Sequence, residues 1–160
     1  MAITMNDLTV NFTHLDRVAL MESWRWLIGE TKQPILLTAL GNAFVQDLVD
    51  GAICMVDTST GDLLAAADSM EHLTELMEDK DFVTRAFDVE AFAALQKAGM
   101  TLQPGQIFSF KVPMALGGQY VLDNIEAMDI TVHFGVTGQI FEQVSKMPEG
   151  AMVSDVSLSS

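Results

Sequence analysis

Apolar and polar positions near the N-terminus predict a short strand followed by a helix. Alternation over residues 8–12 is typical of a strand, and Thr13 or Asp16 can cap a helix that runs to about Ile28. Gly29 is suited to end this helix, because glycine readily adopts the left-handed conformation common just past a helix. The apolar residues at helical spacing, which we expect to face the core, are Leu20, Trp24, Leu27 and Ile28.

The middle of the chain changes from the period of strands to the period of helices. Between Pro34 and Ala66, short apolar runs alternate with turns that contain glycine, which predicts an antiparallel meander. After Ala66 the apolar spacing becomes helical. Ser69, Asp81 and Asp88 are each placed to cap one of three short helices.

The C-terminal third returns to strands and closes with a longer helix. The pattern predicts strands over residues 106–112 and 120–125, and a helix over residues 129–144. Gly135 and Gly138 weaken this helix by about 1 kcal/mol each relative to alanine, which suggests that another segment packs closely there.

The order of elements predicts one α+β domain with a largely antiparallel sheet packed with helices. A length of 160 residues is sufficient to bury a real core. No linker or repeat divides residues 1–150, which we interpret as a single domain. Residues 151–160 are rich in serine and are expected to form a flexible tail.

The balance of charge is strongly acidic. The chain has 22 Asp and Glu residues against 8 Lys and Arg residues, a formal net charge of −14. Such a field repels nucleic acids and anionic membranes and attracts basic partners. Only Lys80 and Arg85 oppose the acids between residues 50 and 90. These acids are Asp50, Asp57, Asp62, Asp68, Glu71, Glu75, Glu78, Asp79, Asp81, Asp88 and Glu90.

Neither a membrane span nor a disulfide is expected. No apolar run approaches the roughly 18 residues needed to cross a bilayer. The first residues lack the basic and apolar regions of a secretory signal. The single cysteine, Cys54, lies in an apolar run and is interpreted as a core thiol. These features favour a cytoplasmic location, because disulfides are rare in that reducing compartment.

Motifs of catalysis and cofactor binding are missing from the sequence. The three histidines, His14, His72 and His133, lack the spacing of metal ligands, and each is interpreted as a surface residue or a hydrogen-bonded core residue. The sequence contains no P-loop, GxSxG or GxGxxG motif and no convincing set of nucleophile, base and orienting group. We therefore expect no cofactor, no metal and no enzymatic activity.

Two weaker signals leave alternatives open. Gly117-Gly118 could cradle an anion, although a tight turn is the commoner use of adjacent glycines. The turn from Asp57 to Asp62 could hold calcium, but it lacks the regular oxygen ligands and the terminal glutamate of an EF-hand loop. Pairs of carboxylates are abundant by composition alone, so they do not indicate acid–base catalysis.

One part of the sequence resembles a known family. Residues 110–118 end a strand with Pro113 and a Leu-Gly-Gly loop, Asn124-Ile125-Glu126 follows, and a helix with His133 comes next. This pattern resembles the C-terminal domain of the type VI secretion DNase-immunity proteins, and the resemblance covers about residues 20–148. Weaker matches lie upstream at Trp24–Gly29, Gly41–Asp47 and Asp81–Val83.

The resemblance implies a cytoplasmic, non-enzymatic protein that binds and neutralises a cognate secreted toxin, often a nuclease. Longer family members carry an additional N-terminal domain that this sequence lacks, so its toxin can differ from theirs. A nuclease needs a positive groove for phosphates. An acidic inhibitor that covers such a groove gains a faster encounter and greater specificity.

We hypothesise that acids between Asp57 and Asp81 supply part of the surface that binds a basic toxin. The alternative is that they form only a solvated face. The candidate partner-binding residues are Asp57, Asp62, Asp68, Glu71, Glu75, Glu78, Asp79 and Asp81. The motif residues expected to maintain the fold are Pro113, Gly117, Gly118 and Asn124.

A second class of function is a regulatory domain that binds a small molecule or a peptide through the Leu-Gly-Gly loop. This reading predicts a pocket with convergent polar groups and binding that is largely indifferent to salt. The sequence leaves the oligomeric state open, and it identifies neither the toxin nor the face that would bind it.

Overall fold

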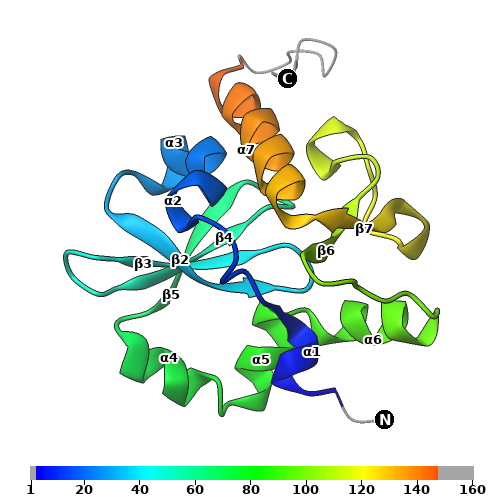
Figure 1. Cartoon of the computed structure of the whole chain (residues 1–160), viewed down its shortest axis with the longest axis horizontal. Coiled ribbons are helices and arrows are strands. Elements are labelled where there is room, and N and C mark those ends of the chain that lie inside the picture. Colours follow the sequence, from blue (N-terminus) through cyan, green and yellow to red (C-terminus); the bar gives the residue numbers. More distant parts are fainter. Residues whose placement is uncertain (1–2, 148–160) are drawn as a thin grey trace.

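A five-stranded antiparallel sheet lies between two layers of helices in the computed structural model, which describes residues 3–147 (Figure 1). The order of its strands is β1-β2-β3-β4-β5, and a second sheet pairs β6 with β7. The strands are β1 (Thr9–Val10), β2 (Lys32–Thr38), β3 (Ala43–Asp47), β4 (Ile53–Asp57), β5 (Asp62–Ala67), β6 (Gln106–Phe110) and β7 (Ile125–Asp129). The predicted α+β class and the meander are therefore confirmed.

Seven α-helices surround the two sheets within the described residues. They are α1 (Met5–Leu8), α2 (Arg17–Leu20), α3 (Arg25–Ile28), α4 (Met70–Leu76), α5 (Lys80–Ala86), α6 (Val89–Lys97) and α7 (Ile130–Lys146). Among the described residues, the 3₁₀ segment η1 (Glu22–Trp24) joins α2 to α3, and the 3₁₀ segments η2 (Met114–Leu116) and η3 (Leu122–Asn124) lie between β6 and β7. The domain boundary predicted at residue 150 and the predicted tail of residues 151–160 lie outside the described residues.

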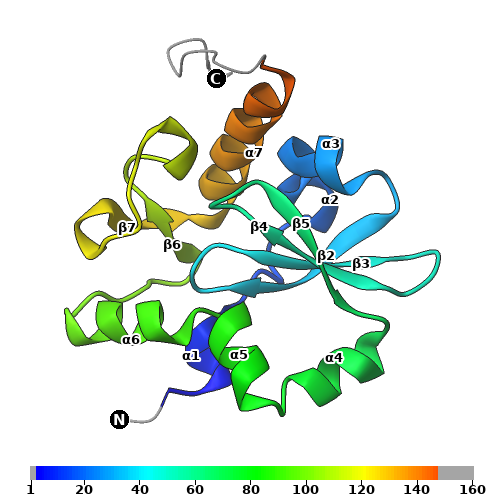
Figure 2. The ribbon, with the colours of Figure 1, turned by 180° about the vertical axis from the view of Figure 1, so that it is seen from behind.

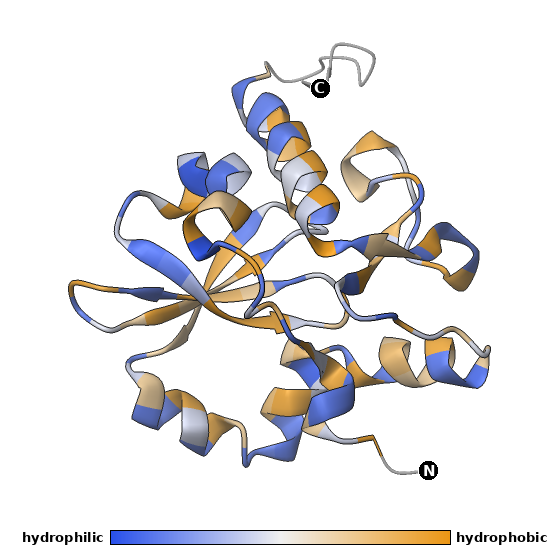
Figure 3. Cartoon of the chain, viewed as in Figure 1, coloured by the Kyte–Doolittle hydropathy of each residue, from blue (hydrophilic) through white to orange (hydrophobic). Residues whose placement is uncertain are grey.

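Each face of the central sheet buries its own core. Side chains alternate along β3, so that Ala43 and Val45 pack toward α2, α3 and α7, whereas Phe44 packs toward α4, α5 and α6. Figures 1 and 2 show these two groups of helices on opposite sides of the sheet. Hydrophobic residues are concentrated on the strands, and the surrounding helices carry mixed hydrophobic and hydrophilic bands (Figure 3).

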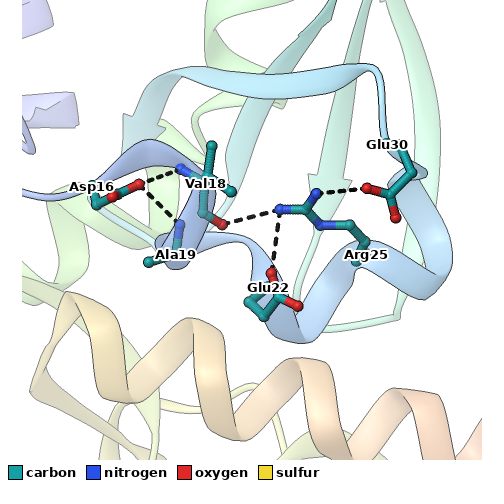
Figure 4. Close-up of polar contacts among 6 residues, drawn as sticks. All are labelled: Asp16, Val18, Ala19, Glu22, Arg25 and Glu30. Carbon is teal, nitrogen blue, oxygen red and sulfur yellow. Dashed lines mark hydrogen bonds and ion pairs between the residues drawn. The ribbon is translucent and has the colours of Figure 1, made fainter.

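The helix predicted from Asp16 to Ile28 is interrupted. Asp16 caps α2 by accepting hydrogen bonds from the amides of Val18 and Ala19, but the helix stops at Leu20 and continues as η1 and α3. The Val18 carbonyl accepts a hydrogen bond from Arg25 Nη2 at 3.2 Å, in place of a helical amide. Figure 4 shows the guanidinium between Glu22 and Glu30, which lie 3.3 and 2.9 Å from it. A long side chain thus satisfies the backbone at the break.

The break places η1 directly against α7. A Cβ atom built on Gly138 of α7 would lie 2.4 Å from the Ser23 carbonyl oxygen, a distance that real side chains do not reach. The Trp26 indole donates to the Gly138 carbonyl at 3.2 Å, and Trp24 is completely buried beside it. Close packing at Gly138 is therefore confirmed, whereas a Cβ at Gly135 would meet nothing within 4 Å.

The strand predicted over residues 120–125 is wrong. Residues Leu122–Asn124 form η3, and the strand that pairs with β6 begins at Ile125. Tyr120, Val121 and Leu122 form a short run of large, mainly apolar side chains of the kind found in strands, but they are 42%, 47% and 41% exposed. These side chains do not pack on a core, and β-propensity alone does not stabilise a strand whose side chains are not buried.

No helix among residues 3–147 is long and apolar enough to cross a bilayer.

Candidate functional site

The candidate acids are distributed along and beyond β5 rather than gathered at one point. Asp57 and Asp62 flank the β4–β5 turn, and Asp68 follows the other end of β5. A strand rises about 3.3 Å per residue, so β5 separates its two ends by roughly 17–20 Å. Figure 2 shows the β4–β5 turn near α7 and α4 at the far end of β5. We call the eight predicted acids and β5 the acidic band.

The carboxylate of Asp57 accepts hydrogen bonds within the β4–β5 turn. Its Oδ1 accepts hydrogen bonds from the Ser59 amide at 2.9 Å and from the Ser59 hydroxyl at 2.6 Å, and the residue is half-buried. This turn packs against α7, because a Cβ on Gly61 would lie 2.5 Å from the Phe141 ring. Asp57 therefore has a local structural role, whereas Asp62 is exposed at the start of β5.

Helix α4 and the turn after it present acids that no cation neutralises within the described residues. Glu71, Glu75 and Glu78 are exposed, and no hydrogen bond or ion pair of their side chains is found within the described part of the chain. Glu71 and Glu75 are four residues apart, a spacing at which like charges destabilise a helix by a few tenths of a kcal/mol. Glu71 lies in the first turn of α4, where the helix dipole favours a negative charge, whereas Glu75 and Glu78 have no such role.

The acids at the ends of α4 and α5 differ in role. Ser69 caps α4, as predicted, by accepting from the His72 amide. His72 Nδ1 accepts a hydrogen bond from the Asp68 amide at 3.0 Å. An Nδ1 atom that accepts carries no hydrogen, so it does not donate to the Asp68 carboxylate, which lies 3.9 Å away.

The cap predicted at Asp81 is wrong by two residues. Asp79 caps α5 instead, with Oδ1 accepting from the amides of Asp81 and Phe82 at 2.9 and 3.3 Å. Asp81 then lies in the first turn of the helix, exposed to solvent, where a negative charge is favoured by the helix dipole. Asp79 therefore contributes to the fold as well as to the acidic band. The cap predicted at Asp88 is confirmed, because its side chain accepts from the Ala91 amide.

The Leu-Gly-Gly loop is held by contacts within itself and with Asn124. Asn124 Oδ1 accepts from the Val112 amide at 2.9 Å, and its Nδ2 donates to the carbonyls of Val112 and Gln119, both at 2.9 Å. A Cβ on Gly118 would lie 1.8 Å from the Val112 carbonyl oxygen, so only glycine fits there. Pro113 precedes η2 and its carbonyl accepts from the Gly118 amide at 3.1 Å.

The same geometry leaves no anion cradle at Gly117-Gly118. The Gly117 amide donates to the Met114 carbonyl at 3.2 Å, and the Gly118 amide is already bonded to Pro113. Gly117 has φ +95°, the left-handed conformation expected where a tight turn reverses the chain. Both amides are used by the turn, which is the commoner reading of these glycines.

His133 is a buried junction between four segments. Its Nε2 lies 2.8 Å from the Gly41 carbonyl oxygen, which can only accept, so Nε2 carries the hydrogen. Its Nδ1 then accepts from the Ser109 hydroxyl at 2.7 Å, while Thr58 Oγ1 lies 3.1 Å from Nε2 and donates to Gly41 at 2.7 Å. Burial lowers the pKa of His133 to about 4, although the bond to the Gly41 carbonyl acts in the opposite direction. The ring is therefore neutral near pH 7.

Sequence reasoning missed the pairing of Ser109 with His133. The residues are 24 positions apart, and no motif marks them in the sequence. A serine within hydrogen-bond reach of a histidine is also the arrangement of a catalytic nucleophile and its general base. The geometry does not open to a substrate, because Ser109 is 6% exposed and the adjoining cavity has a volume of about 20 Å³. That space is comparable to one water molecule.

Two further hollows are lined by none of the eight acids of the acidic band. One, of about 600 Å³, has a rim rich in uncharged polar residues from α1, the loop after β1, the end of α6 and the segment before β6, including Asn11, Gln96 and Gln103. The other, of about 520 Å³, lies between α6 and the exposed residues Tyr120–Leu122. The Tyr120 hydroxyl donates to Asp88, and burial together with this bond raises the pKa of Tyr120.

No group of three or more histidine, cysteine or acidic side chains within residues 3–147 is arranged to hold a metal ion.

Comparison with known proteins supports the family seen in the sequence. Residues 67–141 match the family model described as the C-terminal domain of the type VI secretion immunity protein Tdi1. The resemblance to type VI secretion immunity proteins is thereby confirmed over these residues, which run from the end of β5 into α7. No curated protein sequence matches the chain.

The fold also resembles a solved structure. The crystal structure of Atu4351 from Agrobacterium tumefaciens superposes with a TM-score of 0.55 at 17% sequence identity. The match covers 78% of this chain and 65% of that protein, so this chain spans somewhat less than two thirds of its length. At this level of identity the likeness establishes a common fold.

Proposed function

We propose that the protein is a cytoplasmic immunity protein that binds a cognate secreted toxin through the acidic band and thereby neutralises it. The toxin that best fits such a surface is a basic one, in particular a nuclease, because a groove for phosphates carries positive charge. The action is binding rather than catalysis.

The observation that carries the proposal is the row of uncompensated acids on α4 and in the turn that follows it, within the segment that matches the immunity family. Glu71, Glu75 and Glu78 are exposed and their carboxylates make no ion pair within the described residues. Repulsion among them lowers the stability of the compact state. A partner that supplies the missing positive charges would account for their presence.

Electrostatic attraction explains how such a surface would act. Complementary charge raises the rate of encounter and selects among partners more than it raises affinity itself. Fast capture is useful to an immunity protein, because it must bind the toxin before the toxin reaches its substrate.

Co-expression with the product of the neighbouring gene tests the proposal. We expect the neighbouring protein to be toxic when expressed alone and harmless when this chain is present, and the two to copurify in a fixed stoichiometry. A control strain expresses a catalytically inactive form of the neighbour, which should copurify equally well. Continued toxicity despite abundant folded protein would contradict the proposal.

The hollow near α1 favours a second candidate function, the binding of a small molecule or a peptide by a regulatory domain. Its uncharged polar rim is the kind of lining that a regulatory domain for a small molecule or peptide would use. The Leu-Gly-Gly loop is not part of this lining. This function predicts a small ligand that copurifies with the protein and whose binding is indifferent to salt, and native mass spectrometry of the purified protein would detect it.

A further inference from the structure

We infer that the open edge of β5 is where the toxin docks, by adding a cationic strand to the five-stranded sheet. This inference rests on the proposed function and assigns a binding mode to it. It concerns backbone pairing along one edge, which differs from general attraction toward an acidic surface.

The edge of β5 is unpaired. β5 is the last strand of the sheet, and it pairs with β4 alone. In an antiparallel ladder, alternate residues of an edge strand direct their N–H and C=O groups away from the sheet. No backbone hydrogen bond joins β5 to any segment other than β4 in the part of the chain that the structure describes.

The edge is also accessible along its middle. Leu64 is 44% exposed and Ala65 is exposed, whereas Leu63 packs against the core. Figure 2 shows the chain leaving β5 directly for α4, which lies beyond the end of the strand. An incoming strand would therefore meet two exposed apolar side chains and a row of backbone groups.

The sequence of β5 lacks the lysine and proline that often protect an open edge, although a register irregularity opposite Ile53 and Cys54 interrupts its ladder with β4. Proteins commonly block such edges with lysine, proline or a covering segment. Asp-Leu-Leu-Ala-Ala-Ala contains neither lysine nor proline, and the whole stretch between Lys32 and Lys80 contains no lysine or arginine. β3, β4, β5 and α4 thus form a continuous region without a basic residue apart from His72.

Charge decides between two possible occupants of this edge. A second copy of the chain would bring its own Asp62 and Asp68 against those of the first, and both molecules carry a formal charge of −14. Like charges directly opposed across strands are destabilising. A strand rich in lysine or arginine would instead place positive charges beside Asp62, Asp68 and the glutamates of α4. The occupant with complementary chemistry is therefore a cationic strand of the toxin.

Hydrogen exchange on the full chain tests the pairing directly, with an inactive form of the neighbouring gene product as the probe. In the complex, we expect the exchange rate of the outward-facing amides between Asp62 and Ala67 to fall by a factor of about ten or more. The protected amides should alternate along the strand, as they do in a ladder. Without the toxin these amides should exchange quickly at every protein concentration. Slow exchange that appears without toxin as the concentration rises would assign the edge to a second copy and overturn the inference.

A matched pair of lysine substitutions tests the edge without altering the glutamates. Ala65→Lys places a cation on the exposed edge and should weaken toxin binding about tenfold or more, through repulsion of a cationic strand. Ala98→Lys makes the same change at an exposed position beyond α6 and should leave the affinity unchanged. Equal binding by both variants would overturn the inference, provided both keep the melting temperature of the parent.

The failures of the two ideas are distinguishable. The absence of any complex would contradict the proposed function and this inference together. A complex in which β5 amides remain unprotected and Ala65→Lys binds normally would contradict this inference alone.

Discussion

At the scale of single residues, His133 shows how a fold can depend on one neutral side chain. It joins the β2–β3 turn through Gly41, the β4–β5 turn through Thr58 and β6 through Ser109. The sequence left open whether His133 is a surface residue or a hydrogen-bonded core residue, and it did not indicate the partners, because these come from three segments far apart in the chain. Long-range hydrogen bonds of this kind leave no periodic signal in a single sequence.

The low pKa of His133 makes stability depend on pH in a defined direction. The folded ring has a pKa of about 4 against an ordinary value of 6.5, so the unfolded chain binds more protons between these values. Stability is therefore complete above about pH 6.5 and falls as the pH decreases toward 4, by up to roughly 3 kcal/mol. Urea unfolding at a series of pH values measures this dependence.

Variants separate His133 from the other titrating groups. His133→Asn should lower stability at pH 7 and flatten the dependence between pH 6.5 and 5, where most carboxylates remain ionised. His72→Asn, which changes a half-exposed histidine, should retain the slope of the parent protein. A His133→Asn protein with the parent slope would show that another group is responsible.

At the scale of elements, hydrophobic periodicity identified the strands and helices that bury an apolar face. It failed where a side-chain hydrogen bond to the backbone, or the lack of a core to pack against, decides the local structure. The meander was predictable because glycine turns punctuate its apolar runs. The break after Leu20 was not, because it depends on Arg25 reaching back to the Val18 carbonyl. Residues 120–122 imitate a strand but have no core to cover. For the site, the exposed acids were readable from composition, whereas the local roles of Asp57 and Asp79 required the turn and cap geometry.

The contact between α7 and η1 gives a prediction with an internal control. Gly138→Ala should destabilise the protein by about 1–3 kcal/mol, because the added methyl would overlap the Ser23 carbonyl. Gly135→Ala adds the same methyl where nothing lies within 4 Å and should stabilise α7 by about 0.5–1 kcal/mol. Denaturant unfolding of the two variants compares them directly. Equal effects at both positions would contradict the packing described for this helix.

At the scale of the whole molecule, charge is distributed unevenly. The eight Lys and Arg residues all lie outside the segment of residues 33–79, which carries the meander, α4 and most of the acidic band. A field of this kind offers no advantage to the fold, but it extends beyond contact distance and attracts a basic partner. Composition alone predicts a basic partner. The tertiary arrangement adds that this segment includes an open sheet edge with Asp62 and Asp68 at its two ends.

The most direct test of the immunity account is the rate at which this protein associates with its toxin, measured at increasing salt. Stopped-flow fluorescence with the inactive neighbouring gene product should give a rate that falls about tenfold or more between roughly 0.05 and 0.5 M salt. Glu71→Gln, Glu75→Gln and Glu78→Gln combined should lower the low-salt rate and reduce its salt dependence. Asp79 is left unchanged in this variant because it caps α5. A control that neutralises Glu90, Asp123 and Glu126, whose carboxylates make no ion pair within the described residues, should behave like the parent. A rate that is indifferent to salt and to the three glutamate substitutions would contradict the account.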